Sequence, residues 1–438
     1  MARQGPERGQ RPPSPAEPAG ASRQKADQYR KRRHDLLHRG KAVARERIDG
    51  LLDGGSFVEL DLFAGDGVVG GFGTLDGREV AVYADDPTVP GGPPGEVTAR
   101  KVVKVQELAL RSRIPIVGIH DRGGAPIPGG IPALAGYADV FFRNARSSGV
   151  IPQVGVVAGT GSGEGVPGPA LADFVFVVAG SGEGAHFLAR TEDECWEGVR
   201  ELLSYLPQSS AERPSPRATT DGSDRADPEL QTLVPDSPGL VFDMREVITR
   251  VLDDGRFLEV QQFAAQNIVV GFGRLGGHPV GVVGNQPGVL AGAIDAGASA
   301  KAARFIRFCD AFNVPVVSLV DAPGTSGERG EVSGQGAKLL YAYAEATVPK
   351  LTVVTRRDHG GAYWLMSPKQ TGADLNLAWP TAEIGAAGRE GLEEAAERGY
   401  IDEVIEPKET RRELIRGLEL CLHKQVDRPA RKHGNIPL

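Results

Sequence analysis

The stretch GDGVVGGFGTLDGREVAV at residues 65–82 returns as AQNIVVGFGRLGGHPVGV at residues 265–282. The segment in front of it repeats with the same offset, because DGGSFVELDLF (53–63) returns as DDGRFLEVQQF (253–263). An offset of 200 residues is far longer than the period of a solenoid repeat, which spans a few tens of residues. We therefore interpret the chain as a duplicated domain. Two similar halves can build one site between them, to which each half contributes its own copy of the same structural feature.

Strands and helices alternate within each copy. In the first copy, EVAVYAD (79–85) and PIVGIHD (115–121) have the composition of buried strands, and TARKVVKVQELALRS (98–112) has helical spacing. The second copy repeats this order, with PVVSLVDA (315–322) as a strand and ASAKAARFIRFCDAFN (298–313) as a helix. This alternation predicts an α/β fold of two tandem domains, each a mostly parallel sheet flanked by helices.

Changes in composition divide the chain into five parts. The first residues are rich in Pro, Arg, Gln and Ser and cannot bury a core. Residues 26–50 have the charge and spacing of an amphipathic helix that leads into the first domain. The predicted parts are a disordered tail (1–25), an N-terminal domain (26–207), a polar, Pro-rich linker (208–238), a C-terminal domain (239–425) and a basic C-terminal tail (426–438).

Composition also excludes several classes of function. The net charge of −7 gives no basic footprint for nucleic acid. No apolar run is long enough to span a membrane, and the first residues lack the hydrophobic segment of a secretory signal. The three cysteines are far apart and odd in number, which argues against both a disulfide framework and a zinc cluster. We expect a cytoplasmic protein with no metal, no membrane anchor and no nucleic-acid partner.

Two glycine-rich turns are the best candidates for chemistry, because motifs such as HExxH, GxSxG and the Walker loop are absent. They are GTGSGEGVPGPA (159–170) and HGGAYWLMS (359–367), each after a predicted strand at a matching place in the repeat. Such a turn leaves backbone N–H groups unpaired at the start of a helix, where they can hold a developing oxyanion. A single turn of this kind could serve only to reverse the direction of the chain. Two such turns at matching places in the repeat favour a functional role. His120 and His359 each lie next to a Gly-rich turn, but a lone histidine there is more often structural or solvated than catalytic.

The chain resembles the β (carboxyltransferase) subunit of biotin-dependent acyl-CoA carboxylases of the propionyl-CoA carboxylase type. Matching stretches cover most of residues 35–438 and include RGKAVARERIDGLLDGGSFVEL (39–60), KAARFIRFCDAFNVPV (301–316), GAKLLYAYAEATVPKLTVVTR (336–356), GADLNLAWPTAEI (372–384), AAERGYIDEVIEP (395–407) and KHGNIPL (432–438). The resemblance implies two crotonase-like (ClpP/crotonase) domains, each a β-β-α superhelix. It also implies a homo-oligomer, a dimer or a trimer of dimers, with each active site between the N-terminal domain of one protomer and the C-terminal domain of another.

The resemblance further implies the reaction. Carboxybiotin, carried on a biotin carboxylase/biotin carrier subunit, would deliver CO2 to the α carbon of an acyl-CoA. The N-terminal domain would hold the thioester enolate and the C-terminal domain the biotin oxygen, each through backbone N–H groups. The protein would supply positioning and two oxyanion holes, with no side chain acting as the base.

The residues that the resemblance assigns lie in three segments. Gly163, Glu164, Gly361 and Ala362 are the catalytic candidates, Gly360, Tyr363 and Trp364 the candidates for binding carboxybiotin, and Gly123, Gly124, Ala125 and Gly165 those for binding acyl-CoA. Two positions depart from the family's pattern. Trp364 replaces an aspartate that helps to shape the acyl pocket, and Glu164 stands where the second glycine of the acyl-side hole is expected. Three loops that cover the substrates in the family are shorter here.

Three hypotheses follow from these matches and departures. The first is a carboxyltransferase subunit with altered acyl specificity. The second is a crotonase-fold decarboxylase or hydrolase of a malonyl-type thioester, with Glu164 as its acid or base. The third is a catalytically impaired scaffold within a carboxylase complex. A solvated Glu164 without a chemical role remains the simplest alternative to the second hypothesis.

Overall fold

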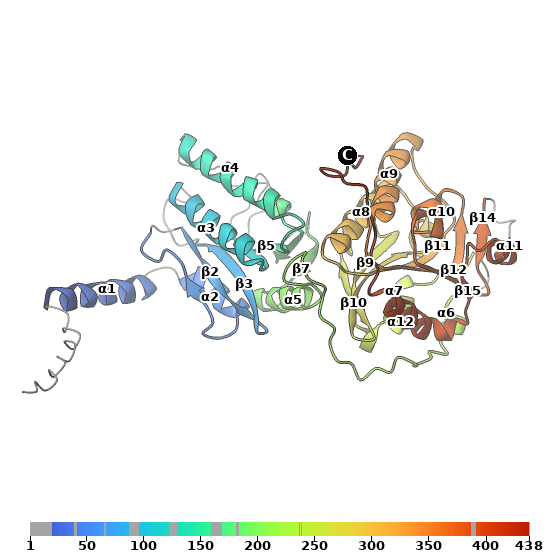
Figure 1. Cartoon of the computed structure of the whole chain (residues 1–438), viewed down its shortest axis with the longest axis horizontal. Coiled ribbons are helices and arrows are strands. Elements are labelled where there is room, and N and C mark those ends of the chain that lie inside the picture. Colours follow the sequence, from blue (N-terminus) through green and yellow to red (C-terminus); the bar gives the residue numbers. More distant parts are fainter. Residues whose placement is uncertain are drawn as a thin grey trace, which may run out of the picture.

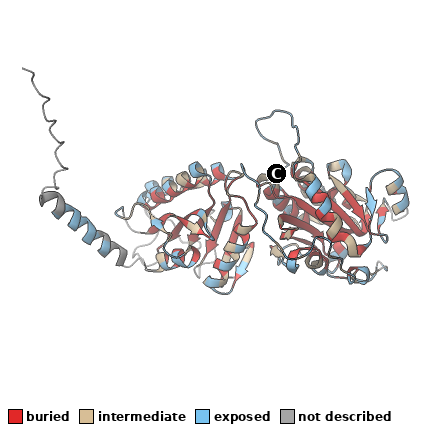
Figure 2. Ribbon diagram, turned by 60° about the horizontal axis from the view of Figure 1, so that its bottom comes forward, coloured by how far each residue is buried: buried red, intermediate tan, exposed pale blue. Residues whose placement is uncertain are grey.

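The structure is a computed structural model that describes residues 20–38, 42–64, 67–86, 96–121, 130–158, 169–180, 184–235, 237, 239–386 and 391–437. The two halves of the chain lie side by side, each built around its own sheet (Figure 1). Buried residues concentrate in these sheets and on the helix faces that cover them (Figure 2).

Within the described residues, the N-terminal half forms a seven-stranded sheet in which strand order follows chain order. Its first three strands pair antiparallel and the remaining strands pair parallel. The strands are β1 (Val58–Glu59), β2 (Val68–Leu75), β3 (Arg78–Asp85), β4 (Ile116–His120), β5 (Gln153–Val157), β6 (Phe174–Val178) and β7 (Phe187–Ala189).

The C-terminal half repeats this sheet with one extra short strand. The antiparallel hairpin has the same register in both halves, since Gly73 pairs with Val80 and Gly273 pairs with Val280. The strands are β8 (Leu258–Val260), β9 (Ile268–Leu275), β10 (His278–Asn285), β11 (Val316–Ala322), β12 (Lys350–His359), β13 (Leu375–Ala378), β14 (Glu383–Gly385) and β15 (Glu403–Val404). The predicted duplication is therefore a structural repeat.

Helices cover both faces of each sheet. In the N-terminal half α3 and α4 pack on one face and α2 and α5 on the other, and in the C-terminal half α8 and α9 lie opposite α7 and α12. The helices are α1 (Gly20–His38), α2 (Ala42–Leu51), α3 (Glu96–Ser112), α4 (Gly130–Ser147), α5 (Glu192–Ser204), α6 (Leu230–Leu233), α7 (Met244–Val251), α8 (Ala296–Ala311), α9 (Arg329–Glu345), α10 (Gly361–Leu365), α11 (Leu392–Glu397) and α12 (Thr410–Cys421).

The N-terminal segment differs from the sequence-based expectation. Helix α1 already begins at Gly20, so the last residues of the predicted disordered tail are helical. The single amphipathic helix expected over 26–50 is instead parts of α1 and α2. Helix α2 inserts apolar side chains into the core, through Ala44, Ile48 and Leu51. The side chains described in α1 are exposed, and this helix projects away from the sheet (Figure 1).

The two halves share one hydrophobic core within the chain. Phe174 of β6 packs edge-on against Phe308 of α8, with ring centroids 4.5 Å apart, and also contacts Phe272 of β9. Backbone bonds cross the same boundary, because Gln261 N–H donates to the His186 oxygen at 2.9 Å. The predicted linker includes α6, and its extended part lies against the C-terminal half, where Arg217 N–H donates to the Gly277 oxygen.

Candidate active site

The turn between β12 and α10 has the geometry of a backbone anion-binding turn. Gly360 adopts φ 56° and ψ −126°, a conformation that residues with a Cβ rarely reach. Its own N–H donates to the Gly385 oxygen at 3.0 Å. The next N–H groups, those of Gly361 and Ala362, belong to the first turn of α10, where a helix has no internal acceptors. The turn therefore offers two adjacent N–H groups from the end of a central strand.

A cavity of about 720 Å3 opens beside this turn. Tyr363 and Trp364 of α10 line one side of it, and Arg398 and Tyr400, which follow α11, line the other. The Trp364 side chain is 62% exposed, so its indole is available to a ligand. The Tyr363 hydroxyl donates to the Gln370 side chain at 2.7 Å, which fixes the ring. Four of the five consecutive residues predicted for the biotin side line this cavity, and the fifth, Ala362, is buried.

Two ionisable residues at the end of β12 were not predicted as part of the site. Asp358 is buried, and its Oδ1 has no hydrogen-bond partner among the described residues. Burial alone raises the pKa of this carboxyl group to about 8, so it is protonated at neutral pH. His359 Nε2 lies 3.6 Å from Glu383 Oε2 on the neighbouring β14. The sequence signal was weak, an acidic residue and a histidine directly before the glycine pair of the turn.

The predicted acyl-side residues lie outside the described residues. Gly123, Gly124 and Ala125, like Gly163, Glu164 and Gly165, follow strands β4 and β5. These two strands pair in parallel, so the chain leaves the sheet at the same edge after His120 and after Val157. The strand β5 occupies the place in its sheet that β12 occupies in the other. The two glycine-rich turns therefore follow equivalent strands, as the repeat predicted.

Each half has an arginine-bound aspartate at this edge of its sheet. Asp321, one residue before the end of β11, is fully buried and accepts from Arg356 Nη2 at 2.7 Å and from Arg357 Nε at 2.6 Å. Asp121, its counterpart in the repeat, is bound by Arg47 of α2. The same carboxylate position is therefore neutralised in both halves, although the arginines come from different elements. In the C-terminal half these contacts hold β11 and β12 together directly before the β12–α10 turn.

His120 is not the lone histidine that the sequence suggested. Its Nδ1 lies 3.5 Å from Asp85 Oδ2, and its ring packs edge-on against Tyr83. The pKa of Tyr83 is raised, first by burial and then by the negative charge of Asp85. This small polar cluster occupies the ends of β3 and β4, at the edge from which the acyl-side segments leave the sheet.

A duplicated sheet, with a glycine turn after the fifth strand of its second copy, fits the class of protein that the sequence resembles, the carboxyltransferases of acyl-CoA carboxylases. The family model described as "Carboxyl transferase domain" matches residues 35–183, 181–395 and 392–436. The chain belongs to this family. Helices able to cross a membrane, and clusters of side chains suited to a metal ion, are both missing from the part of the chain that the structure describes.

Several relatives match over almost their full length. The propionyl-CoA carboxylase beta chain of Saccharopolyspora erythraea is 44% identical, over 94% of this chain and 95% of its own. The methylmalonyl-CoA decarboxylase subunit alpha of Veillonella parvula is 42% identical, over 91% of this chain and 94% of its own. Among solved structures, transcarboxylase 12S superposes with a TM-score of 0.90 at 36% identity and covers 97% of this chain and 100% of its own.

The alignments also support the shortening of this chain. The match to the Saccharopolyspora relative extends over 522 aligned positions, more than the 438 residues present here. That relative therefore carries segments that this chain lacks.

Proposed function

We propose that this carboxyltransferase moves CO2 between carboxybiotin, carried on a partner biotin carboxylase/biotin carrier subunit, and the α carbon of a short acyl-CoA. The observation that carries the proposal is the β12–α10 turn, with its glycine at positive φ and two N–H groups beside an open cavity. The relatives' names specify biotin-dependent acetyl- and propionyl-CoA carboxylation. The cytoplasmic location expected from the sequence remains a prediction.

The residues of the cavity fit a biotin group. A volume of about 720 Å3 lies within the usual range for small-molecule sites, which is roughly 300–1,000 Å3. Trp364 and Tyr363 supply flat apolar walls for the cavity. Helix α10 carries no charged side chain that would disfavour the neutral ring of biotin. When bound, carboxybiotin supplies the CO2 that is transferred. The chain's own N–H groups, at Gly361 and Ala362, would donate to an oxygen on which negative charge develops.

On the acyl side, we propose that Gly163 and Glu164 present the corresponding N–H groups and that Gly123, Gly124, Ala125 and Gly165 contact the acyl-CoA. The equivalence of β5 and β12 supports this assignment, because both turns continue the fifth strand of their sheets. Holding the enolate by backbone dipoles costs no reorganisation during the reaction, which is why such donors give large rate effects.

The test is carboxylation by the assembled enzyme. The chain, mixed with its biotin carboxylase/carrier subunit and ATP, is expected to fix labelled bicarbonate into acetyl-, propionyl- or butyryl-CoA, and avidin is expected to block the reaction. Failure to label any of these thioesters in the presence of a carboxylated carrier would overturn the proposal.

Decarboxylation is the second candidate function, and the match to a methylmalonyl-CoA decarboxylase subunit favours it. The loss of CO2 from methylmalonyl-CoA would then be faster than the carboxylation that forms methylmalonyl-CoA. Activity that needs no biotin carrier and disappears in Glu164→Gln would assign the acid–base role to Glu164. Full activity of that variant would exclude this role for Glu164.

We also propose that the chain assembles into a homo-oligomer, a dimer or a trimer of dimers. Helix α4 presents an apolar stripe that includes Ile131, Leu134 and Phe142, which are 81%, 55% and 57% exposed. Exposed apolar side chains on one helix face are typical of contact surfaces, and the structurally similar transcarboxylase 12S forms a hexamer assembly. Light scattering should show that Leu134→Arg lowers the assembled mass. The control Leu420→Arg, at an 84% exposed position on α12, should leave the mass unchanged.

A further inference from the structure

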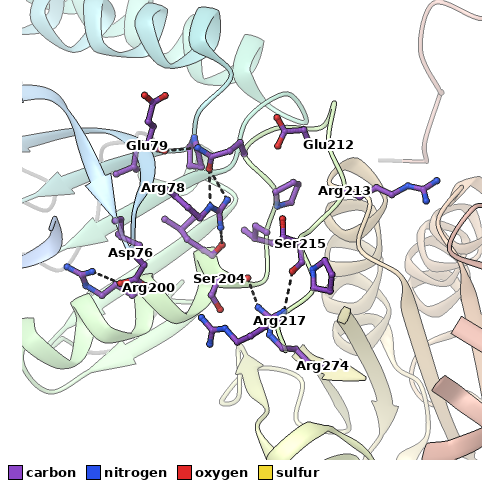
Figure 3. A pocket seen from close by; sticks show the side chains of 18 residues that line it. Asp76, Arg78, Glu79, Arg200, Ser204, Glu212, Arg213, Ser215, Arg217 and Arg274 are labelled. Atoms are coloured by element: carbon purple, nitrogen blue, oxygen red, sulfur yellow. Dashed lines mark hydrogen bonds and ion pairs between the residues drawn. The ribbon is translucent and has the colours of Figure 1, made fainter. Parts of the chain in front are cut away.

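A second cavity lies between the two halves of the chain, and none of its lining residues borders the cavity beside α10. It has a volume of about 250 Å3. The hairpin between β2 and β3, the end of α5, the linker and β9 enclose it (Figure 3). We call it the interdomain cleft and define it by Arg78, Gln208, Arg217 and Arg274.

The Arg78 guanidinium, from the N-terminal half, bonds only to uncharged groups among the described residues. Its Nε and Nη2 donate to the Gln208 side-chain oxygen at 3.2 and 2.8 Å, and its Nη1 donates to the Leu203 oxygen. Burial lowers the pKa of Arg78, despite the opposing influence of Glu212. A partly buried guanidinium without a bonded carboxylate is costly, because its charge loses water and gains no ionic partner.

The Arg274 guanidinium, from the C-terminal half, also bonds only to uncharged groups among the described residues. Its Nη2 donates to the Ser204 oxygen at 2.6 Å and its Nη1 to the Gly277 oxygen at 3.0 Å. The guanidinium lies over the Tyr205 ring, 5.1 Å from the centroid. Burial is the main cause of its lowered pKa, and the nearby charge of Arg217 adds to it.

Arg217, from the linker, places a third guanidinium beside Arg274 (Figure 3). Its side chain forms no hydrogen bond or ion pair with a described residue, so all five of its N–H donors remain available. Its backbone is fixed, because its N–H donates to the Gly277 oxygen at 3.0 Å. A Cβ added at Gly277 would lie 2.2 Å from the Arg217 oxygen, which shows how closely the linker follows this turn.

The acidic side chains of the cleft form no ion pair with these three arginines among the described residues, and Glu79 is exposed. Asp76 pairs with Arg200 at 3.0 Å. Arg213 points away from the cleft, toward the Leu422 oxygen (Figure 3). Glu212 is exposed and forms no ion pair with a described residue, which leaves it screened by water.

We propose that the interdomain cleft binds a phosphate dianion, which joins the two halves of the chain and the linker. Arginine recognises phosphate through pairs of parallel N–H donors, and such charge-assisted bonds are roughly twice as strong as neutral ones. The volume of about 250 Å3 suits a small anion, since it lies below the range of roughly 300–1,000 Å3 of larger ligand sites. Free phosphate and the terminal phosphate of a nucleotide share the required chemistry.

The test is the midpoint of thermal unfolding of the full-length assembled protein, with chloride used to hold the ionic strength constant. Millimolar inorganic phosphate is expected to raise the midpoint in a saturable way, by roughly 2 °C. Adenosine diphosphate forms the second arm. If adenosine diphosphate shifts the unfolding midpoint at a lower concentration than inorganic phosphate does, the ligand is a nucleotide phosphate. If it needs the same or a higher concentration, the ligand is free phosphate.

Arg217→Gln is the main variant, because the Arg217 side chain supports no contact on which folding depends. This variant is expected to lose the phosphate shift and to keep its unfolding midpoint without phosphate. Arg274→Gln is expected to lose the shift as well. The control Arg100→Gln, on the exposed surface of α3, is expected to keep it. An equal shift in Arg217→Gln and the unmodified protein, or no shift in either, would overturn the proposal.

Discussion

Gly360 decides, at the scale of the single residue, whether the β12–α10 turn can present its N–H groups. Its φ of 56° and ψ of −126° are accessible to glycine and costly for a residue with a Cβ. Its neighbour Gly361 has little room, because an added Cβ would lie 3.2 Å from the Thr325 side chain. The sequence predicted a glycine turn here, and the backbone angles of Gly360 are ones that favour glycine.

Gly360→Ala is expected to lower kcat of carboxyl transfer about 100-fold, the usual effect of misplacing an oxyanion donor. The matched control is Gly334→Ala on α9, where an added Cβ meets no atom within 4 Å and φ is not positive. The labelled-bicarbonate assay compares the two variants. Equal activities would show that the conformation of Gly360 is not needed for catalysis.

Asp358 makes stability depend on pH. Its pKa is about 8 in the folded protein and has an ordinary value of 3.8. Between these values the unfolded chain loses a proton that the folded chain retains, so the free energy of unfolding falls as pH rises from about 4 to about 8. Asp358→Asn removes this titration.

The expected result for Asp358→Asn is a midpoint of thermal unfolding that exceeds that of the unmodified protein more at pH 8 than at pH 5. The control Asp427→Asn, at an exposed position, should show no such difference between the two pH values. An Asp358→Asn variant whose advantage is the same at both pH values would contradict a buried, protonated carboxyl group.

Strands β1 and β8 show, at the scale of the element, why the repeated GFG motif needs its glycines. They lie antiparallel to β2 and β9 and very close to them. A Cβ added at Gly71 would lie 2.0 Å from the Val58 oxygen, and one added at Gly271 would lie 2.4 Å from the Leu258 oxygen. The motif that revealed the duplication is therefore a packing requirement of each sheet.

Gly271→Ala is expected to destabilise the protein by about 1–3 kcal/mol, because the extra methyl group forces β8 away from β9. Denaturant unfolding measures this loss. Gly54→Ala, where an added Cβ meets nothing within 4 Å, serves as the control and should stay within about 0.5 kcal/mol of the unmodified protein.

At the scale of the whole molecule, the contacts of Phe174 with Phe272 and Phe308 join the two halves into one folding unit. We call these contacts the aromatic seam. Phe308 of α8 contacts Phe174 across the boundary and is 8% exposed. The seam orients the β12–α10 turn of one half relative to the strands β4 and β5 of the other. Relative motion of the halves is therefore restricted within a single chain.

Phe308→Ala is expected to cost about 3–5 kcal/mol and to separate the unfolding of the two halves. Calorimetry should then show two transitions where the unmodified protein shows one. Phe263→Ala, at a 65% exposed position, is the control and should leave the transition unchanged. A single, unshifted transition in Phe308→Ala would mean that the seam does not couple the halves.

The sequence by itself determined the duplication, the α/β class, and the glycine turn at residues 359–362, because periodicity and glycine placement are local properties of the chain. It also placed Tyr363 and Trp364 at the candidate site, through resemblance to a family. It missed Asp358 as a neutral buried acid, since burial depends on what packs against a strand end.

Only the tertiary structure decided which distant residues meet. Arg78, Arg217 and Arg274 lie on three separate segments, and nothing in their local sequences predicts that they share one cleft. The same holds for the seam between Phe174 and Phe308. Charges and aromatic rings act through space, so their effects follow from the packing of whole elements, which a local pattern does not contain.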